Sequence, residues 1–339
     1  MTDDTSPVLV TGGSGFLAAH TILQLLQAGH RVRTTVRSAG RRDELAEALV
    51  GAGTDVAALS FVIADLSADD GWDEAVSGTE YVLHMASPFP PRQPDDPDEL
   101  IGPARDGTLR VLHAAARHGV RRVVLTSSFA AVGYSPKPSG APYDESDWTD
   151  PAQDNSPYVL SKTLAERAAW EFTAEHPGAP ELTVINPVGV FGPALGSNLS
   201  SSVGIIAMLL SGRPSPLPRA SFTVVDVRDV ADLHIRAMSS PVAAGQRYLA
   251  AAGAAMTLPE IAATLRERLG EDAARVPVEV ASDDEVRAAA TERPELEVFA
   301  GLLGTPKQIS AAKAVAQLGW HPRPAADAVT ATAASLLSR

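Results

Sequence analysis

The 339-residue chain contains no cysteine, which excludes disulfide bonds, thiolate metal sites and thiol nucleophiles. It also has no long hydrophobic run, because an apolar stretch such as 205–210 is far shorter than the about 20 residues of a membrane span. Positive charge is scarce: 28 lysines and arginines oppose 41 acidic residues, for a formal net charge of −13. This balance argues against nucleic acid and anionic membranes as partners, although a few local arginines can still hold a phosphate-bearing cofactor.

Metal-ligand spacing is missing as well. The eight histidines form no such pattern and no cysteine accompanies them, so we expect no metal. Residues 1–7 are acidic and polar, unlike the basic start of a secretory signal peptide. Together with the lack of cysteine, which fits a reducing compartment, this predicts a cytoplasmic protein.

Strand-like and helix-like patterns alternate through the first half of the chain. We expect strands over 7–10, 31–36, 59–63, 81–85, 122–125 and 182–185, and helices over 16–28, 42–50, 70–76, 97–118 and 158–174. Such alternation predicts parallel βαβ units with right-handed crossovers, and therefore an α/β fold with a Rossmann-type doubly wound parallel sheet.

The alternation ends beyond Gly192, where we expect strands over 222–227 and 248–250 and helices over 257–269, 283–290 and 325–337. A chain of 339 residues exceeds the size of most single hydrophobic cores. We therefore predict a nucleotide-binding Rossmann domain over residues 1–190 with a returning segment near 225–252. Residues 191–224 and 253–339 would form a smaller C-terminal substrate-binding lobe.

A glycine-rich loop joins the first expected strand to the first expected helix. It has the spacing Gly-x-x-Gly-x-x-Ala, with its members at Gly12, Gly15 and Ala18. Gly12 can make the tight turn, and Gly15 lets a pyrophosphate approach the backbone at the positive end of the following helix. Glycine loops also occur as simple strand–helix turns, but the strand before this one and the alternation after it predict a dinucleotide site.

The end of the second expected strand distinguishes the two nicotinamide cofactors. An NAD site usually has an acidic residue there, whereas this chain has Arg37, then Arg42, and no acid before Asp43. A guanidinium can bind a 2′-phosphate bidentately, so we expect NADP(H), with a solvated basic turn as the alternative. Asp65 and Leu66 follow the third strand and are expected beside the adenine.

Tyr158 and Lys162 lie four residues apart on an expected helix, so both side chains project from one face. A free tyrosine has a pKa of about 10, and a nearby ammonium would lower it. Tyr158 is thus predicted to protonate the developing alkoxide in a carbonyl reduction, with Lys162 also binding the nicotinamide ribose. Ser128 would hold the substrate oxygen, with Ser127 as the fallback.

Each of these motifs is common when it occurs alone. Their shared position links them, because the glycine loop, residues 85–87, 127–128 and 186–187 all follow expected parallel strands directly. The carboxyl ends of the strands form the edge where open α/β sheets bind ligands.

Five segments carry a family resemblance: 11–17, 35–37, 83–88, 158–166 and 186–193. They resemble the extended short-chain dehydrogenase/reductases, and more narrowly the dihydroflavonol reductase and aldehyde/ketone reductase branch. Segments 225–231 and 318–322 also match, so the resemblance covers nearly the whole chain. It implies a Rossmann lobe, NADP(H), a catalytic triad of Ser128, Tyr158 and Lys162, and backbone from Pro187 to Val190 flanking the nicotinamide.

The loop, the strand ends and the resemblance together define the expected cofactor-binding set: Gly12, Ser14, Gly15, Phe16, Leu17, Arg37, Arg42, Asp65, Leu66, Ala86, Ser87, Tyr158, Lys162, Pro187 and Val190.

Departures from the family pattern bear on the substrate. Dehydratase members carry an Asp-Glu pair after the serine, where this chain has Phe129 and Ala130. The Asn-Trp-Tyr-Cys-Tyr signature of cinnamoyl-CoA reductases is absent, as is the asparagine that flavonoid reductases carry near Gly133. We therefore expect an NADPH-dependent carbonyl reductase whose small-molecule substrate is a less polar aldehyde or ketone.

Two alternatives stay open at this point. A nucleotide-sugar epimerase or a 3β-hydroxysteroid dehydrogenase-like enzyme would share the machinery but usually favours NAD, against which Arg37 counts. A catalytically silent NADP(H)-sensing regulator would keep the fold, but such proteins commonly lose the tyrosine or lysine that this chain retains. The chain could be a monomer or a homodimer.

Overall fold

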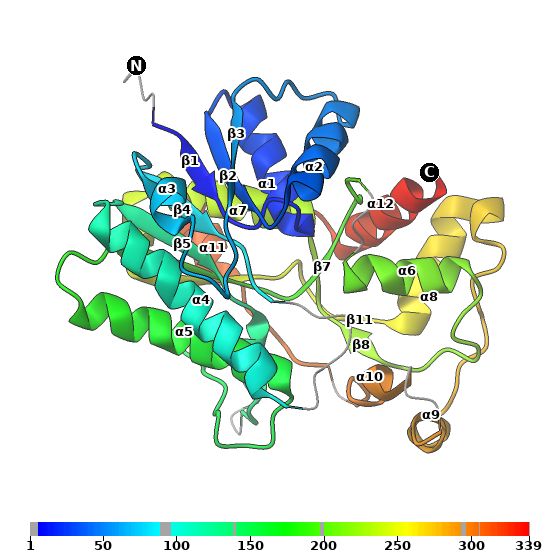
Figure 1. Cartoon of the computed structure of the whole chain (residues 1–339). Coiled ribbons are helices and arrows are strands. Elements are labelled where there is room, and N and C mark those ends of the chain that lie inside the picture. Colours follow the sequence, from blue (N-terminus) through cyan, green and yellow to red (C-terminus); the bar gives the residue numbers. More distant parts are fainter. Residues whose placement is uncertain are drawn as a thin grey trace.

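The computed structural model of the chain describes residues 6–88, 96–137, 140–196, 200–292, 296–304 and 306–338. Its larger part is a seven-stranded sheet in the order β3-β2-β1-β4-β5-β6-β10 (Figure 1). Every pairing in this sheet is parallel. The prediction of an α/β fold with a Rossmann-type doubly wound parallel sheet is therefore confirmed.

The seven strands lie close to the ranges expected from the sequence. They are β1 (Val8–Val10), β2 (Val32–Val36), β3 (Leu59–Ile63), β4 (Tyr81–His84), β5 (Arg122–Thr126), β6 (Glu181–Pro187) and β10 (Gln246–Ala250). The helices packed on them are α1 (Phe16–Gln27), α2 (Ala39–Gly51), α3 (Trp72–Val76), α4 (Asp98–Arg117), α5 (Pro157–Glu175), α7 (Val227–Ser239) and α11 (Ala312–Leu318).

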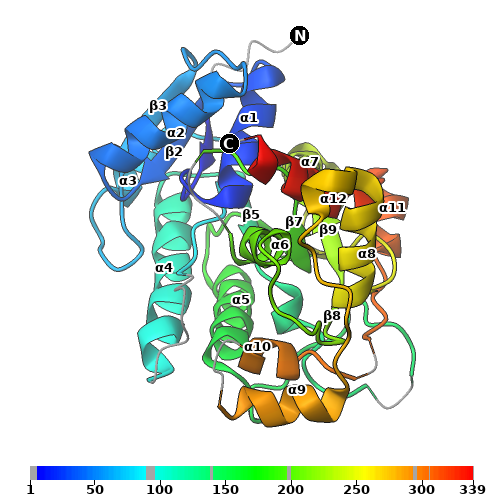
Figure 2. The same ribbon diagram turned by 90° about the vertical axis from the view of Figure 1, so that its right-hand side faces the viewer.

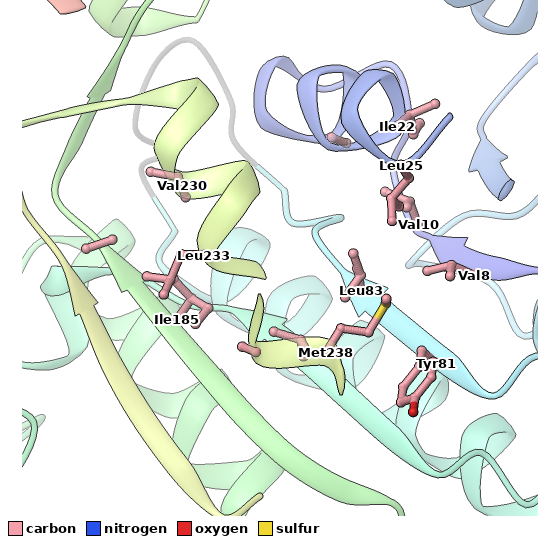
Figure 3. Packing of buried hydrophobic residues seen from close by; sticks show 14 of the residues in the cluster. Val8, Val10, Ile22, Leu25, Tyr81, Leu83, Ile185, Val230, Leu233 and Met238 are labelled. Carbon is pink, nitrogen blue, oxygen red and sulfur yellow. The ribbon is translucent and has the colours of Figure 1, made fainter. Parts of the chain in front are cut away.

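Successive side chains of each strand enter different hydrophobic layers, because the side-chain period of a strand is two residues. Val8 and Val10 of β1 belong to a buried cluster with Ile22 of α1 and Leu233 of α7 (Figure 3). Leu9 between them belongs to a second cluster, which contains residues of α3, α4 and α5. Both faces of the sheet are thus covered by helices, as parallel sheets require.

Two helix starts show how local chemistry sets the boundaries. The side chain of Ser156 accepts a hydrogen bond from the Val159 amide, and Pro157 takes the first helical position of α5, one residue before the expected start. The start of α3 was expected at residue 70 but lies at Trp72. Gly71 has φ of +84°, and a Cβ there would lie 2.2 Å from the Ile63 carbonyl oxygen, so the chain turns sharply before the helix begins.

The expected single strand over 222–227 is wrong. The structure instead has β8 (Ser221–Phe222), then β9 (Val224–Asp226), and α7 begins at Val227. Asp226 caps this helix by accepting a hydrogen bond from the Arg228 amide at 2.9 Å. The buried side of α7 packs against α1 and the sheet, so its helical state depends on tertiary contacts that the short apolar run does not reveal.

A third hydrophobic cluster lies beyond the sheet and contains residues from the second half of the chain. Its helices are α6 (Ser201–Leu210), α8 (Leu258–Leu269), α10 (Glu297–Ala300) and α12 (Ala325–Leu337), near β11 (Met256–Thr257) and α9 (Asp283–Ala290). Figure 2 shows α8 and α12 side by side, away from α2 and α3. In contrast, Ala314 and Leu318 of α11 pack with the sheet. The two-lobe division of the chain stays a prediction.

Of the helices in the described ranges, none combines the length and the apolar character that crossing a bilayer requires. The first five residues, on which the expectation about a signal peptide partly depended, lie outside these ranges.

Candidate active site

The carboxyl ends of β1 and β4 meet where the strand order of the sheet reverses. The hydroxyl oxygen of Thr11, just past β1, accepts hydrogen bonds at 3.0 Å from the amides of Met85 and Ala86, just past β4. It also lies 2.8 Å from Nδ1 of His84. These bonds join the glycine loop to the segment after β4, at the topological switch point where doubly wound sheets bind ligands.

The glycine loop keeps side chains away from the start of α1. Gly12 has φ of +70°, and a Cβ there would lie 2.9 Å from the Cα of Ala86, while one at Gly13 would lie 2.2 Å from Oγ1 of Thr34. Gly15 is the N-cap of α1 and provides no side-chain cap.

The first amides of α1 are available to a ligand. Within the described part of the chain, the Phe16 and Leu17 amides have no hydrogen-bond acceptor. A bare backbone cradle with free amides at the positive end of a helix suits a pyrophosphate, so the residues present fit a dinucleotide.

The arginines expected at the 2′-phosphate differ in their surroundings. Arg42 donates from Nε to the carboxylate of Asp43 at 2.9 Å, in an exposed ion pair. Arg37 is exposed and forms no hydrogen bond or ion pair with another described residue. Its guanidinium is thus the more available of the two for an anionic ligand.

Asp65 and Leu66 follow β3, as expected. The amide and hydroxyl of Ser67 donate to the Asp65 carboxylate at 2.8 Å and 2.6 Å. These bonds, with a smaller contribution from the charge of Arg37, lower the pKa of Asp65. The Leu66 carbonyl accepts a hydrogen bond from Arg110 at 2.7 Å. The position of the adenine beside Asp65 and Leu66 stays a prediction.

The two serines after β5 have different partners. Ser127 donates from its hydroxyl to the carboxylate of Glu166 at 2.6 Å, toward the protein interior. Ser128 lies 3.3 Å from the hydroxyl of Tyr158, and both line a cavity. The geometry therefore favours Ser128, rather than the fallback Ser127, as the residue that meets a substrate.

The pKa of Tyr158 departs from the expectation. Burial is the largest influence and raises its pKa, the hydrogen bond with Ser128 lowers it, and Tyr134 raises it again. The expected lowering by an adjacent ammonium is not found, because burial dominates and Nζ of Lys162 donates instead to Ser87 at 2.9 Å. A phenol with a raised pKa keeps its proton at neutral pH, which is the state that a proton donor needs.

Lys162 is itself buried, and burial lowers the pKa of its ammonium to about 8, although the charge of Glu166 partly offsets this effect. Glu166 follows Lys162 by four residues, so both lie on the same side of α5. The carboxylate therefore acts on the ammonium through its charge, while Nζ of Lys162 donates its hydrogen bond to Ser87.

Glu166 is a member of the site that the sequence analysis missed. Its carboxylate is fully buried and accepts hydrogen bonds from Nε of Arg247 at 2.6 Å and from Nδ2 of Asn186 at 2.7 Å, besides the bond from Ser127. Nδ2 of Asn186 also donates to the Ser128 carbonyl at 3.1 Å. This network joins β5, β6, β10 and α5 beneath the Ser128–Tyr158 pair.

The spacing of Tyr158, Lys162 and Glu166, four residues apart each time, could have revealed the Glu166 position. No comparable signal marked Arg247, which lies 81 residues away in a strand.

His84 is buried at the carboxyl end of β4. Burial, with a smaller effect of the Lys162 charge, lowers its pKa to about 3, so the ring is neutral at physiological pH. The Thr11 oxygen already accepts two amide hydrogen bonds, so its own hydrogen points to Nδ1 of His84 and the ring proton is assigned to Nε2. Nε2 has no hydrogen-bond partner among the described residues.

A cavity of about 330 Å³ opens beside the Ser128–Tyr158 pair. Pro187 is part of its lining, whereas Val190 is not among the described lining residues, and the carbonyl of Val190 accepts a hydrogen bond from the Ser202 hydroxyl. Apart from the two catalytic candidates, the walls are mostly aromatic and aliphatic, for example Phe129 and Phe222. The arrangement can hold a small, largely apolar molecule with one oxygen atom near two hydroxyl groups.

The chain is similar in sequence to a large enzyme family and to individual reductases. The profile of the NAD dependent epimerase/dehydratase family matches residues 8–251. Cinnamoyl-CoA reductase CAD2 of Medicago truncatula is 37% identical over 304 residues, which cover 86% of this chain and 92% of that protein. The putative NADPH-dependent methylglyoxal reductase GRP2 of Candida albicans is 37% identical over 268 residues, which cover 73% of this chain and 78% of that protein.

A solved structure of a reductase has the same fold as this chain. The crystal structure of yeast methylglyoxal/isovaleraldehyde reductase Gre2 complexed with NADPH matches this chain with a TM-score of 0.81 and 28% sequence identity. The match covers 98% of each chain, so it includes both the sheet and the third hydrophobic cluster.

Proposed function

Because the chain belongs to the NAD dependent epimerase/dehydratase family, within the extended short-chain dehydrogenase/reductases, we propose that it is an NADPH-dependent carbonyl reductase. It is an oxidoreductase that uses NADP(H) and acts on carbonyl groups. The observation that carries the finer proposal is the 3.3 Å approach of the Tyr158 and Ser128 hydroxyls at the wall of a mostly apolar cavity. The substrate is an aldehyde or a ketone.

Ser128 and Tyr158 act on the substrate oxygen. Both hydroxyls can donate a hydrogen bond to one carbonyl oxygen, which polarises the carbonyl and stabilises the charge that develops on the oxygen. Bound NADPH supplies the hydride that reaches the carbonyl carbon. Tyr158 donates its proton to the oxygen, so that the product is an alcohol, and its raised pKa keeps that proton in place at neutral pH.

Lys162 and Ser87 are assigned to the cofactor ribose. Nζ of Lys162 donates a hydrogen bond to the Ser87 hydroxyl at 2.9 Å, and the ammonium has two further donors for ribose hydroxyls. The amides of Phe16 and Leu17 would hold the pyrophosphate, and Arg37 would hold the 2′-phosphate.

The test is a screen of NADPH consumption across aldehydes, α- and β-ketoesters and aryl ketones, with NADH in parallel. We expect consumption of NADPH that matches the alcohol formed, and faster turnover with NADPH than with NADH. Tightly bound NAD in the purified protein, with epimerase activity, would instead favour the epimerase alternative. Binding of NADPH without turnover of any carbonyl compound would favour the regulator.

A small-molecule carbonyl compound is thus the proposed partner. The cytoplasmic location and the choice between monomer and homodimer stay predictions.

A further inference from the structure

Lys307 brings a positive charge to the cavity beside Ser128 and Tyr158. It is the one charged side chain among the described residues that line the cavity. Its ammonium donates to the Gly133 carbonyl at 2.6 Å and lies 4.0 Å from the centre of the Tyr134 ring. The cation therefore comes from the segment between α10 and α11 and lies against the loop that follows β5.

This ammonium has no acidic partner within the described ranges, since its contacts are a carbonyl and aromatic rings. Although much of the Lys307 residue is exposed, its ammonium is partly covered at the cavity wall, and this partial burial lowers its pKa. An ammonium has three donors, and the Gly133 carbonyl uses one of them. Two donors remain for a ligand, and an anionic ligand would supply the missing counter-charge.

Tyr134 links this cation to the catalytic end of the cavity. Its ring lies under the Lys307 ammonium, and Tyr134 and Tyr158 both line the cavity. Apolar side chains such as Val188, Phe222 and Leu302 form much of the remaining wall. The cavity thus has two hydroxyls for a carbonyl oxygen, an apolar body, and a cation at a separate position.

We propose that Lys307 binds the carboxylate of the substrate, so that the cavity takes oxo acids in which an apolar group separates the carbonyl from the carboxylate. This inference rests on the proposed carbonyl reductase function. A neutral aldehyde or ketone would still fit the apolar walls but would leave the ammonium without a counter-charge. The alternative is that the Lys307 ammonium only holds its own segment against the Gly133 carbonyl and does not contact the substrate.

The test compares aryl oxo acids, with one to four methylene groups between carbonyl and carboxylate, and the methyl ester of each acid. The full-length enzyme is assayed with NADPH, as are Lys307→Met and Lys307→Arg. Lys313→Met is the matched control, because Lys313 also lies over a tyrosine ring, that of Tyr248 at 5.3 Å, but not at this cavity.

We expect the parent enzyme to prefer at least one acid over its ester. Lys307→Met should lower kcat/KM for that acid about 10- to 100-fold more than for its ester, mainly through KM, as for the loss of a hydrogen bond to a charged group. Lys307→Arg should retain the preference, and Lys313→Met should leave it unchanged.

Two results would overturn the inference and leave the proposed function intact. One is an equal loss of kcat/KM for acids and esters in Lys307→Met, which would show that Lys307 only holds its own segment against Gly133. The other is turnover of acids and esters with no difference between the parent enzyme and the variant. If no compound is turned over, the proposed function has failed, and calorimetric titration of the same acids and esters into the parent protein and Lys307→Met decides the inference. Weaker binding of the acids to the variant alone would support it, and equal binding would refute it.

Discussion

The hydroxyl of Tyr158 lies 3.3 Å from the hydroxyl of Ser128, although 30 residues separate the two in the chain. Ser128 follows the end of β5, and Tyr158 lies in the first turn of α5, where Ser156 and Pro157 set the start of the helix. The end of β5 and the first turn of α5 therefore hold the two hydroxyls together. The first prediction concerns the proton that Tyr158 donates from this position.

Replacing Tyr158 by phenylalanine removes the proposed proton donor without changing the ring. We expect Tyr158→Phe to lower kcat for a simple aldehyde by roughly 10²–10⁴, because general acid catalysis contributes about that much. Steady-state NADPH consumption measures the loss, and circular dichroism confirms that the fold survives. Tyr81→Phe is the control, since the Tyr81 hydroxyl contacts Arg121 at the other end of the sheet. Turnover of Tyr158→Phe at the parental rate would exclude the assigned role.

Arg37 is expected to select the phosphorylated cofactor. Arg37→Ala should raise the KM for NADPH about 10- to 100-fold, as for lost hydrogen bonds between charged groups, with little change for NADH. Arg42→Ala is the comparison and should have the smaller effect, because Asp43 already pairs with that guanidinium. Equal losses for the two cofactors in Arg37→Ala would refute the contact with a 2′-phosphate.

Glu166 is expected to act as a positioning residue. Glu166→Gln leaves the buried Arg247 guanidinium without its counterion, so the free energy of unfolding should fall by about 3–5 kcal/mol. It also removes the negative charge that raises the pKa of Lys162. The alkaline limb of the kcat/KM profile, where Lys162 loses its proton, should therefore move to lower pH.

The control for this change is Glu171→Gln, an exposed carboxylate on the same helix. A double variant, Glu166→Gln with Arg247→Met, should recover part of the stability but keep the shifted pH limb. If the limb does not move in either variant, Glu166 has only a structural role.

The buried ammonium of Lys162 predicts how stability changes with pH. Its pKa is about 8 in the folded protein, against an ordinary value of 10.5. Between these values the unfolded chain binds a proton that the folded chain has lost, so the contribution of Lys162 to the free energy of unfolding rises with pH. It should rise by about 3 kcal/mol from pH 7 to pH 11.

Urea unfolding of the parent protein and of Lys162→Met at several pH values measures the contribution of Lys162 to the free energy of unfolding. The free energy of unfolding of the parent, relative to the variant, should increase across the interval from pH 8 to pH 10.5. A difference that is constant or falls with pH would show that the ammonium is not desolvated in the folded protein.

Much of the sheet could be predicted from the sequence, because strand and helix periodicities are local. The ranges 59–63, 283–290 and 325–337 coincide with β3, α9 and α12, and most other boundaries moved by a few residues. The error at 222–227 has a tertiary cause: Asp226 caps α7, and burial against α1 holds that helix, so a short apolar run was read as one strand.

The sequence by itself determined the parallel architecture and the placement of Tyr158 and Lys162 on one side of a helix, since both depend on spacings of a few residues. Only the tertiary structure decided that Ser127 turns inward to Glu166 while Ser128 meets Tyr158. It also brought Arg247 to Glu166 over 81 residues and Lys307 to Gly133 over 174 residues. Such contacts arise from how strands and loops pack together, and packing between distant segments leaves no periodic pattern in the chain.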